Sequence, residues 1–144
     1  MSSHRTLLLL TLLLVLYSAV NAAEIVVVIH PGSGIDHLNR GDAINIFLGR
    51  FRQLPSGISA QPIDLPAGQP EKADFYHLLV NKELSDINAY WARLQFSGRI
   101  APPRQARSTE DLLDFVNSTP GAVGYVDRTK ADDRVKVILD LTPK

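Results

Sequence analysis

The sequence predicts an α/β fold with a small mixed sheet flanked by helices. Two observations support this class. A continuous β-branched run over 24–30 is typical of a strand buried on both faces, and several later segments repeat apolar residues at helical spacing. Strands and helices follow one another along residues 23–144, a length that can build an ordinary hydrophobic core. This pattern favours a single layered domain.

The first part of this region is predicted to form a strand, a helix and a second strand. The run over 24–30 is the first strand and ends at a Pro-Gly turn. A helix is expected over 39–51, because its apolar residues recur at helical spacing and a glycine lies near its end. Residues 58–65 alternate imperfectly and predict the second strand, with Pro62 suggesting a sheet edge.

Two consecutive helices are expected in the middle of the chain. Pro70 suits the first turn of a helix over 71–80, since proline is tolerated where the backbone N–H has no helical partner. The next helix is expected over 85–96, with Ser85 as its N-cap. Residues 97–107 contain a glycine and two prolines and are therefore predicted to be irregular.

The last part is predicted to contain one helix and two strands. Ser108 is the expected cap of a helix over 108–116, and strands are expected over 121–126 and 134–141. In the last strand, every second residue from Val135 is expected to share one face. The predicted order is strand, helix, strand, three helices and two strands.

Residues 1–22 are interpreted as a cleavable signal peptide. Arg5 gives a basic start, the apolar run over 7–16 is short for a membrane span, and Val20 and Ala22 supply the small-residue pattern of a cleavage site. An uncleaved membrane anchor is the alternative. Because the sequence contains no cysteine, a bacterial periplasm fits better than a disulfide-rich extracellular scaffold. We therefore expect a periplasmic protein without stable membrane insertion after cleavage.

Composition and motifs argue against several other functions. Fifteen Lys and Arg residues balance fifteen Asp and Glu residues, which gives no support for nucleic acid as a partner. His30, His37 and His77 have no second histidine at metal-ligand spacing, and Ser33 lacks the surroundings of a nucleophile elbow. We therefore expect no enzymatic activity, metal or cofactor.

Several segments also stand in the order typical of a known family. The most specific is Thr-Pro-Gly-Ala-Val-Gly-Tyr-Val over 119–126. With the strand at 26–28, the helix end at 46–50 and the Tyr-Trp pair at 90–91, it resembles the phosphate-type substrate-binding proteins of ABC transporters. The resemblance implies a type II periplasmic binding protein-like fold. A complete member has two closing lobes, and this chain resembles only the second, inserted one.

The resemblance also implies where an anion would bind. The family's inserted lobe uses an arginine followed by a Ser-Gly-Thr turn at a helix N-terminus, where the helix dipole favours negative charge. Here Leu65 stands near the arginine, Gln69 and Pro70 near the serine and glycine, and Glu71 near the threonine. Proline lacks an N–H donor and Glu71 would repel an anion. Gly68 and Gln69 are the candidate ligand residues that remain.

A second candidate anion site is the small-residue loop formed by Gly32, Ser33 and Gly34. It follows the buried first strand, where successive backbone N–H groups can form an anion-binding nest. An ordinary turn after the strand is the alternative, because the loop lacks the lysine of a phosphate-binding loop.

Two functional hypotheses follow. The first is an exported, non-enzymatic solute-binding-like protein that binds phosphate or another small anion. The second is a ligand-free accessory module that keeps the lobe fold. Such a module would pair with another copy of the chain, as a homo-oligomer, or with a different exported protein, through the face that the missing lobe would cover.

Overall fold

The structure is a computed structural model that describes residues 23–98 and 100–143. The interpretation of residues 1–22 as a signal peptide lies outside the described residues and stays a prediction.

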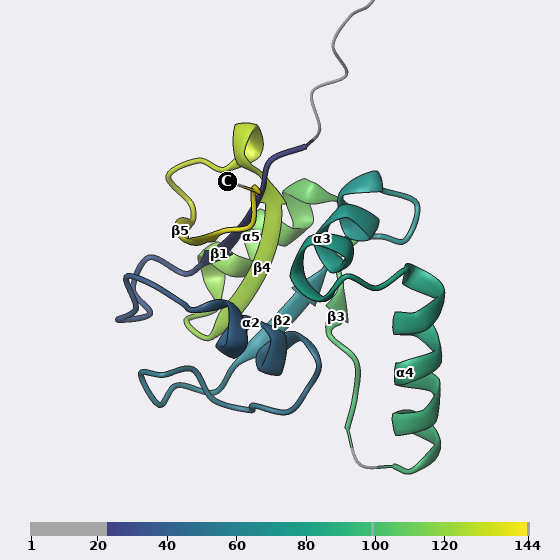
Figure 1. Cartoon of the computed structure of the whole chain (residues 1–144). Coiled ribbons are helices and arrows are strands. Elements are labelled where there is room, and N and C mark those ends of the chain that lie inside the picture. Colours follow the sequence, from purple (N-terminus) through teal and green to yellow (C-terminus); the bar gives the residue numbers. More distant parts are fainter. Residues whose placement is uncertain (1–22, 99, 144) are drawn as a thin grey trace, which may run out of the picture.

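A mixed sheet organises the described part of the chain (Figure 1), in the strand order β3-β2-β4-β1-β5. The central strand β1 is buried along its whole length, as its β-branched sequence predicts. It pairs antiparallel with β4 and β5, whereas β2 runs parallel to both β4 and β3. The strands are β1 (Ile25–Ile29), β2 (Gln61–Asp64), β3 (Arg104–Gln105), β4 (Ala122–Asp127) and β5 (Lys136–Asp140).

Helices cover both faces of this sheet, which gives the predicted α/β fold. Neighbouring residues of β4 show the two layers, because successive side chains of a strand point to opposite faces. Gly124 lies directly against Leu112 of α5, and Tyr125 stacks on Phe75 of α3 with ring centroids 3.7 Å apart. The helical elements are α2 (Arg40–Phe47), α3 (Pro70–Val80), α4 (Leu84–Phe96), α5 (Thr109–Ser118) and the short 3-10 helix η2 (Arg128–Lys130).

The helix ends agree with the sequence at two positions and differ at one. Ser108 caps α5 by accepting a hydrogen bond from the backbone N–H of Asp111 at 3.1 Å. Gly49 ends α2 with φ +74°, and a Cβ atom there would lie only 2.9 Å from the Trp91 ring. The predicted cap of α4 is wrong, because the helix begins one residue before Ser85 and its N-cap is Glu83.

The region predicted to be irregular contains a short strand that the sequence pattern does not reveal. Arg104 and Gln105 form β3 by pairing with Ile63 and Asp64, so β2 is not the edge strand that Pro62 suggested. Pro62 is tolerated because β3 pairs only with the two residues that follow it.

The predicted face of the last strand is also wrong. Ile138 is buried whereas Val137 is 38% exposed, because the register of β1 against β5 shifts between Val27 and Val28. This bulge places one extra residue of β5 opposite β1 and turns Ile138 toward the core.

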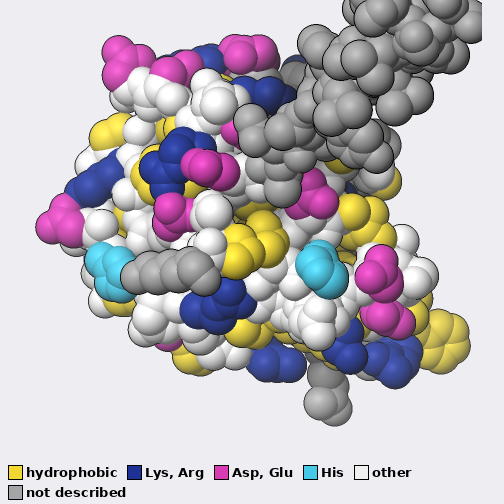
Figure 2. Space-filling model, turned by 45° about the horizontal axis from the view of Figure 1, so that its top comes forward, with side chains coloured by type: hydrophobic (Ala, Val, Ile, Leu, Met, Phe, Trp, Pro, Cys, Tyr) yellow, Lys and Arg dark blue, Asp and Glu magenta, His cyan; other side chains and the backbone are white. Residues whose placement is uncertain are grey.

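Charges on the surface are mixed in sign. Figure 2 shows basic and acidic side chains interspersed over one face of the molecule. This distribution agrees with the equal numbers of basic and acidic residues in the sequence.

Candidate functional site

The candidate site lies at the carboxyl edge of the three parallel strands β3, β2 and β4. In open α/β sheets, ligands bind outside the carboxyl ends of the strands. The chain leaves β2 there and enters α3, and it leaves β3 there and enters α5. The two helix starts meet, since the side-chain amide Nε2 of Gln69 donates to the Thr109 hydroxyl at 3.4 Å.

The start of α3 is occupied by a carboxylate of the chain itself. Pro70 stands at the first helical position and has no N–H to offer, and the N-cap Gln69 makes no side-chain capping bond. The Glu71 carboxylate accepts from Lys130 Nζ at 2.7 Å and from its own backbone N–H. The hydrogen bond from Lys130 is the main cause of the lowered pKa of Glu71. A free anion would therefore have to compete with Glu71.

The start of α5 is closed by its own cap. Ser108 satisfies the N–H of Asp111, and the Asp111 carboxylate accepts from the backbone N–H of Arg107 at 2.9 Å. That backbone bond is the main cause of the lowered pKa of Asp111. The Arg107 side chain is 89% exposed, and its guanidinium also donates to the Asp111 carboxylate at 3.4 Å.

A buried polar cluster lies just inside this edge. Asp64 ends β2 and accepts from the hydroxyls of Tyr76, at 2.8 Å, and Tyr125, at 3.0 Å, while Lys72 Nζ lies 3.8 Å from its other oxygen. Burial raises the pKa of Asp64 despite the nearby Lys72. The backbone N–H of Leu65 donates to the Tyr125 hydroxyl at 3.2 Å, so the cluster holds the start of the loop that leads to α3.

The sequence did not indicate this cluster. Asp64 and Tyr125 stand 61 residues apart in the sequence. Neither residue is unusual for the strand in which it lies. The one available signal was a carboxylate between Ile63 and Leu65 at the end of the predicted strand, where an unpaired charge would be costly to bury.

The residues predicted at the α3 site lie at this edge. Gly68 is exposed in the loop before α3, with open space around it, and Gln69 is half-buried at the N-cap. The side-chain oxygen Oε1 of Gln69 is buried and has no hydrogen-bond partner in the described part of the chain. Leu65, which stands near the family's arginine, is fully buried in the core and carries no charge to the edge.

The other predicted site, Gly32, Ser33 and Gly34, lies at the opposite edge of the sheet. It follows β1, which runs antiparallel to β4, so it cannot join Gly68 and Gln69 in one site. Two backbone N–H groups of this loop donate hydrogen bonds within the loop. The Gly32 N–H donates to His30 Nδ1 at 2.8 Å, and the Ser33 N–H donates to the His30 carbonyl at 3.0 Å. The two predicted sites are therefore separate, and the site over 32–34 stays a prediction.

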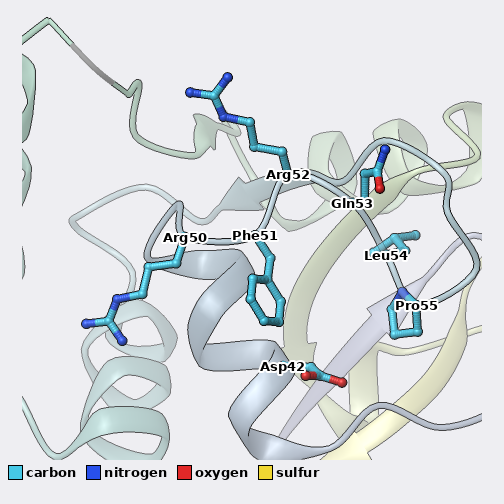
Figure 3. Close-up of a pocket in the computed structure, with 7 residues that line it drawn as sticks. All are labelled: Asp42, Arg50, Phe51, Arg52, Gln53, Leu54 and Pro55. Atoms are coloured by element: carbon cyan, nitrogen blue, oxygen red, sulfur yellow. The ribbon is translucent and has the colours of Figure 1, made fainter.

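A depression near the end of α2 does not bring together hydrogen-bond donors that could bind an anion. It measures about 610 Å³, and Figure 3 shows the Phe51 ring pointing along the helix toward Asp42, while the guanidinium groups of Arg50 and Arg52 extend away. Phe51 is 45% exposed, so the depression presents an apolar ring beside a carboxylate.

The described residues give no geometric sign of a metal site or of a membrane span. Over residues 23–98 and 100–143, three or more His, Cys, Asp or Glu side chains do not gather as metal ligands anywhere. Within the same ranges, every helix is too short or too polar to cross a bilayer.

Comparison with solved structures shows what the fold resembles. No protein-family model and no curated protein matches the sequence. The fold is similar to a phosphate ABC transporter substrate-binding protein with bound phosphate from Clostridium perfringens, with TM-score 0.64 and 12% identity over 81% of this chain and 44% of that one. An ABC-type phosphate transport receptor from Vibrio cholerae gives TM-score 0.64 and 14% identity over 81% and 45% of the two chains.

A third similar structure is PstS from Borrelia burgdorferi, with TM-score 0.62 and 12% identity over 81% of this chain and 46% of that one. The chain thus spans less than half the length of each of these structures and has the fold of a single solute-binding-like lobe. The similarity confirms, at the level of fold, the resemblance that the sequence motifs predict.

Proposed function

We propose that the chain is an exported, non-enzymatic solute-binding-like lobe that binds phosphate or another small anion at the carboxyl edge of its parallel strands. The observation that carries the proposal is the meeting of two helix starts, through Gln69 and Thr109, in a fold shared with phosphate-binding proteins. The donors available there are the backbone around Gly68, the Thr109 hydroxyl and the Lys130 ammonium.

An anion at this edge must displace Glu71. Its carboxylate holds Lys130 at 2.7 Å, and Pro70 removes one backbone donor from the same helix turn. A single lobe also leaves its ligand open to water, which weakens every polar contact. We therefore expect weak binding by the isolated chain and stronger binding once the carboxylate is neutralised.

Thermal unfolding of the purified protein tests this proposal. The melting temperature is measured with millimolar phosphate and with sulfate or chloride at matched ionic strength. A ligand at about 100 times its dissociation constant adds about 2.7 kcal/mol, which shifts the melting temperature by several degrees in a domain of this size. Glu71→Gln should enlarge the phosphate shift, because it removes the competing charge and keeps the side-chain shape.

The matched control is Glu83→Gln, which neutralises an acidic residue at the start of α4, away from the carboxyl edge. This variant should leave the phosphate shift unchanged. The proposal fails if neither the unmodified protein nor Glu71→Gln responds to phosphate more than to chloride.

The second candidate function is a ligand-free interaction module, favoured by the pairing of Glu71 with Lys130 across the edge. A lobe that fills its own anion position has a surface suited to a second copy or to another exported protein. Sedimentation analysis and cross-linking in the periplasm test this function. A strictly monomeric protein that yields no cross-linked species would contradict it.

Export rests on residues 1–22. When the full chain is expressed in a bacterium, the periplasmic product should begin at Ala23, which N-terminal sequencing detects. Retention of the full chain in the membrane fraction would instead support the anchor alternative.

A further inference from the structure

A second concave surface lies between the end of α2, the end of α3 and α4, and we call it the α2–α4 groove. Its volume is about 420 Å³. The groove contacts the carboxyl-terminal residue of α3, Val80, whereas the proposed phosphate site lies at the other end of the same eleven-residue helix. At 1.5 Å per residue the two ends are about 16 Å apart, so the groove is a separate site.

Apolar side chains form the floor of the α2–α4 groove. Ile44, Leu48, Val80 and Tyr90 line it, and the Tyr90 hydroxyl donates to the carbonyl of Leu48 at 2.6 Å. That bond satisfies the one polar atom of the ring. The floor can therefore accept a hydrocarbon chain or an aromatic ring without burying an unpaired polar group.

Two carbonyl acceptors at the end of α3, beside the groove, are already used. The guanidinium of Arg40 donates to the carbonyls of Leu78, at 2.6 Å, and Leu79, at 3.2 Å, at the end of α3. With these acceptors occupied, the negative end of the helix dipole is neutralised locally. An anionic group in the groove is therefore repelled less by the negative end of this dipole.

Three cations surround the floor. Arg50, Lys82 and Arg93 are exposed, and their side chains form no ion pair or hydrogen bond with the residues that the structure describes. Asp86 is the one acidic residue among the described residues that line the groove. The charge of the groove is therefore positive, although the sequence as a whole is balanced.

Cations elsewhere on the molecule behave differently. Arg134 pairs with three carboxylates, and Lys130 pairs with Glu71. The cations of the α2–α4 groove thus differ from the general pattern of this surface. Unpaired cations around an apolar floor are complementary to a molecule that has an apolar body and an anionic end.

We propose that the α2–α4 groove binds a small amphipathic anion: an apolar chain or ring that carries one carboxylate, sulfonate or phosphate group. The apolar body lies on Ile44, Val80 and Tyr90, and the anionic group is held by Lys82 and Arg93. The volume of the groove matches a small molecule, because ligand pockets measure roughly 300–1,000 Å³, whereas a helix about 10 Å across does not fit within it.

Isothermal titration of the purified protein with decanoate, decanol and decyltrimethylammonium tests the ligand class. The three probes share one hydrocarbon chain and differ in charge. Decanoate should bind at a single site, decanol about tenfold or more weakly, and the cationic probe more weakly still. Equal binding of decanoate and decanol would overturn the proposal, since it would assign no role to the three cations.

Variants of α4 locate the site. Asp86, Ala89, Tyr90 and Arg93 share one helix face. Ala89→Leu fills the groove with a good helix former and should abolish decanoate binding without lowering the melting temperature. The control, Ala92→Leu, changes an exposed alanine of the same helix that does not line the groove. Decanoate binding that survives Ala89→Leu would place the ligand elsewhere and overturn the proposal.

Charge variants complete the test. Lys82→Gln combined with Arg93→Gln should weaken decanoate binding about tenfold and leave decanol binding unchanged. Asp86→Asn should strengthen decanoate binding, because it removes the one opposing charge. These variants do not touch the carboxyl edge, so the phosphate response expected under the proposed function should persist in all of them. Unchanged decanoate affinity in the double variant would contradict the role of the cations.

Discussion

Two carboxylates beside the start of α3 have opposite surroundings. Asp64 lies inside the protein and accepts from two tyrosine hydroxyls, with Lys72 at 3.8 Å. Glu71, seven positions later, lies at the edge and pairs with Lys130, with side chains that are 14% and 45% exposed respectively. Burial raises the pKa of Asp64, whereas the hydrogen bond from Lys130 lowers the pKa of Glu71. A carboxylate thus contributes to the buried polar cluster at one position and to the candidate site at the other.

This difference separates the stability of the fold from the anion binding proposed at the edge. Asp64 connects β2, α3 and β4, so its loss should weaken the fold. Glu71 connects the start of α3 with the half-exposed Lys130 of η2, so its loss should change the candidate site and weaken the fold less than the loss of Asp64. The following predictions test that separation, beginning with the largest expected effect.

Asp64→Ala should destabilise the protein by about 3–5 kcal/mol, since removing one partner of a buried pair leaves the other uncompensated. Two tyrosine hydroxyls and the Lys72 ammonium would lose their acceptor. Glu71→Ala should cost less, about 1–2 kcal/mol, because its partner Lys130 is 45% exposed and can be hydrated once the carboxylate is lost. Urea unfolding measures both values, and equal losses would remove the distinction between the two carboxylates.

Tyr125→Phe should cost about 2 kcal/mol and Tyr76→Phe about 1 kcal/mol, within the range for buried hydrogen bonds. Both changes keep the aromatic packing and remove a donor to Asp64. Only Tyr125→Phe also leaves the buried N–H of Leu65 without its acceptor. The same urea experiment measures both variants, and a larger loss for Tyr76→Phe would show that the loop bond contributes little.

The pH dependence of stability should have opposite signs for the two carboxylates. The folded protein holds a proton on Asp64 more tightly than the unfolded chain does, so its contribution falls as the pH rises above about 4. The lowered pKa of Glu71 gives a contribution that is lost as the pH falls below about 4.3. Subtracting the stability profiles of Asp64→Asn and Glu71→Gln from that of the unmodified protein isolates each term. Difference curves of equal sign would contradict the assignment.

Local sequence patterns predict much of the fold. The β-branched run of β1, proline at the start of α3 and the Ser108 cap of α5 act over a few residues, and the structure confirms each. The two-residue strand β3 was missed, because its strand conformation comes from pairing with β2 rather than from its own composition. The buried face of β5 was missed because a bulge in its pairing with β1 shifts the register.

The candidate site shows the same division. Gly68 and Gln69 stand at the helix start that the sequence indicates. Their surroundings are not local, because Gln69 meets Thr109 and Glu71 meets Lys130 from 59 residues away. The second predicted cluster, over 32–34, looks equivalent in sequence, but the antiparallel direction of β1 places it at the opposite edge.

The sequence by itself determined the class of fold and most helix and strand positions, because these depend on neighbours along the chain. Its composition also determined that the protein has no cysteine thiol and no net charge. Only the tertiary structure decided which charged groups pair. Whether a carboxylate is buried with tyrosines, as Asp64 is, or occupies a helix start beside a lysine, as Glu71 does, depends on segments about 60 residues apart. Electrostatic interactions act through space, and their strength depends on burial that only packing creates.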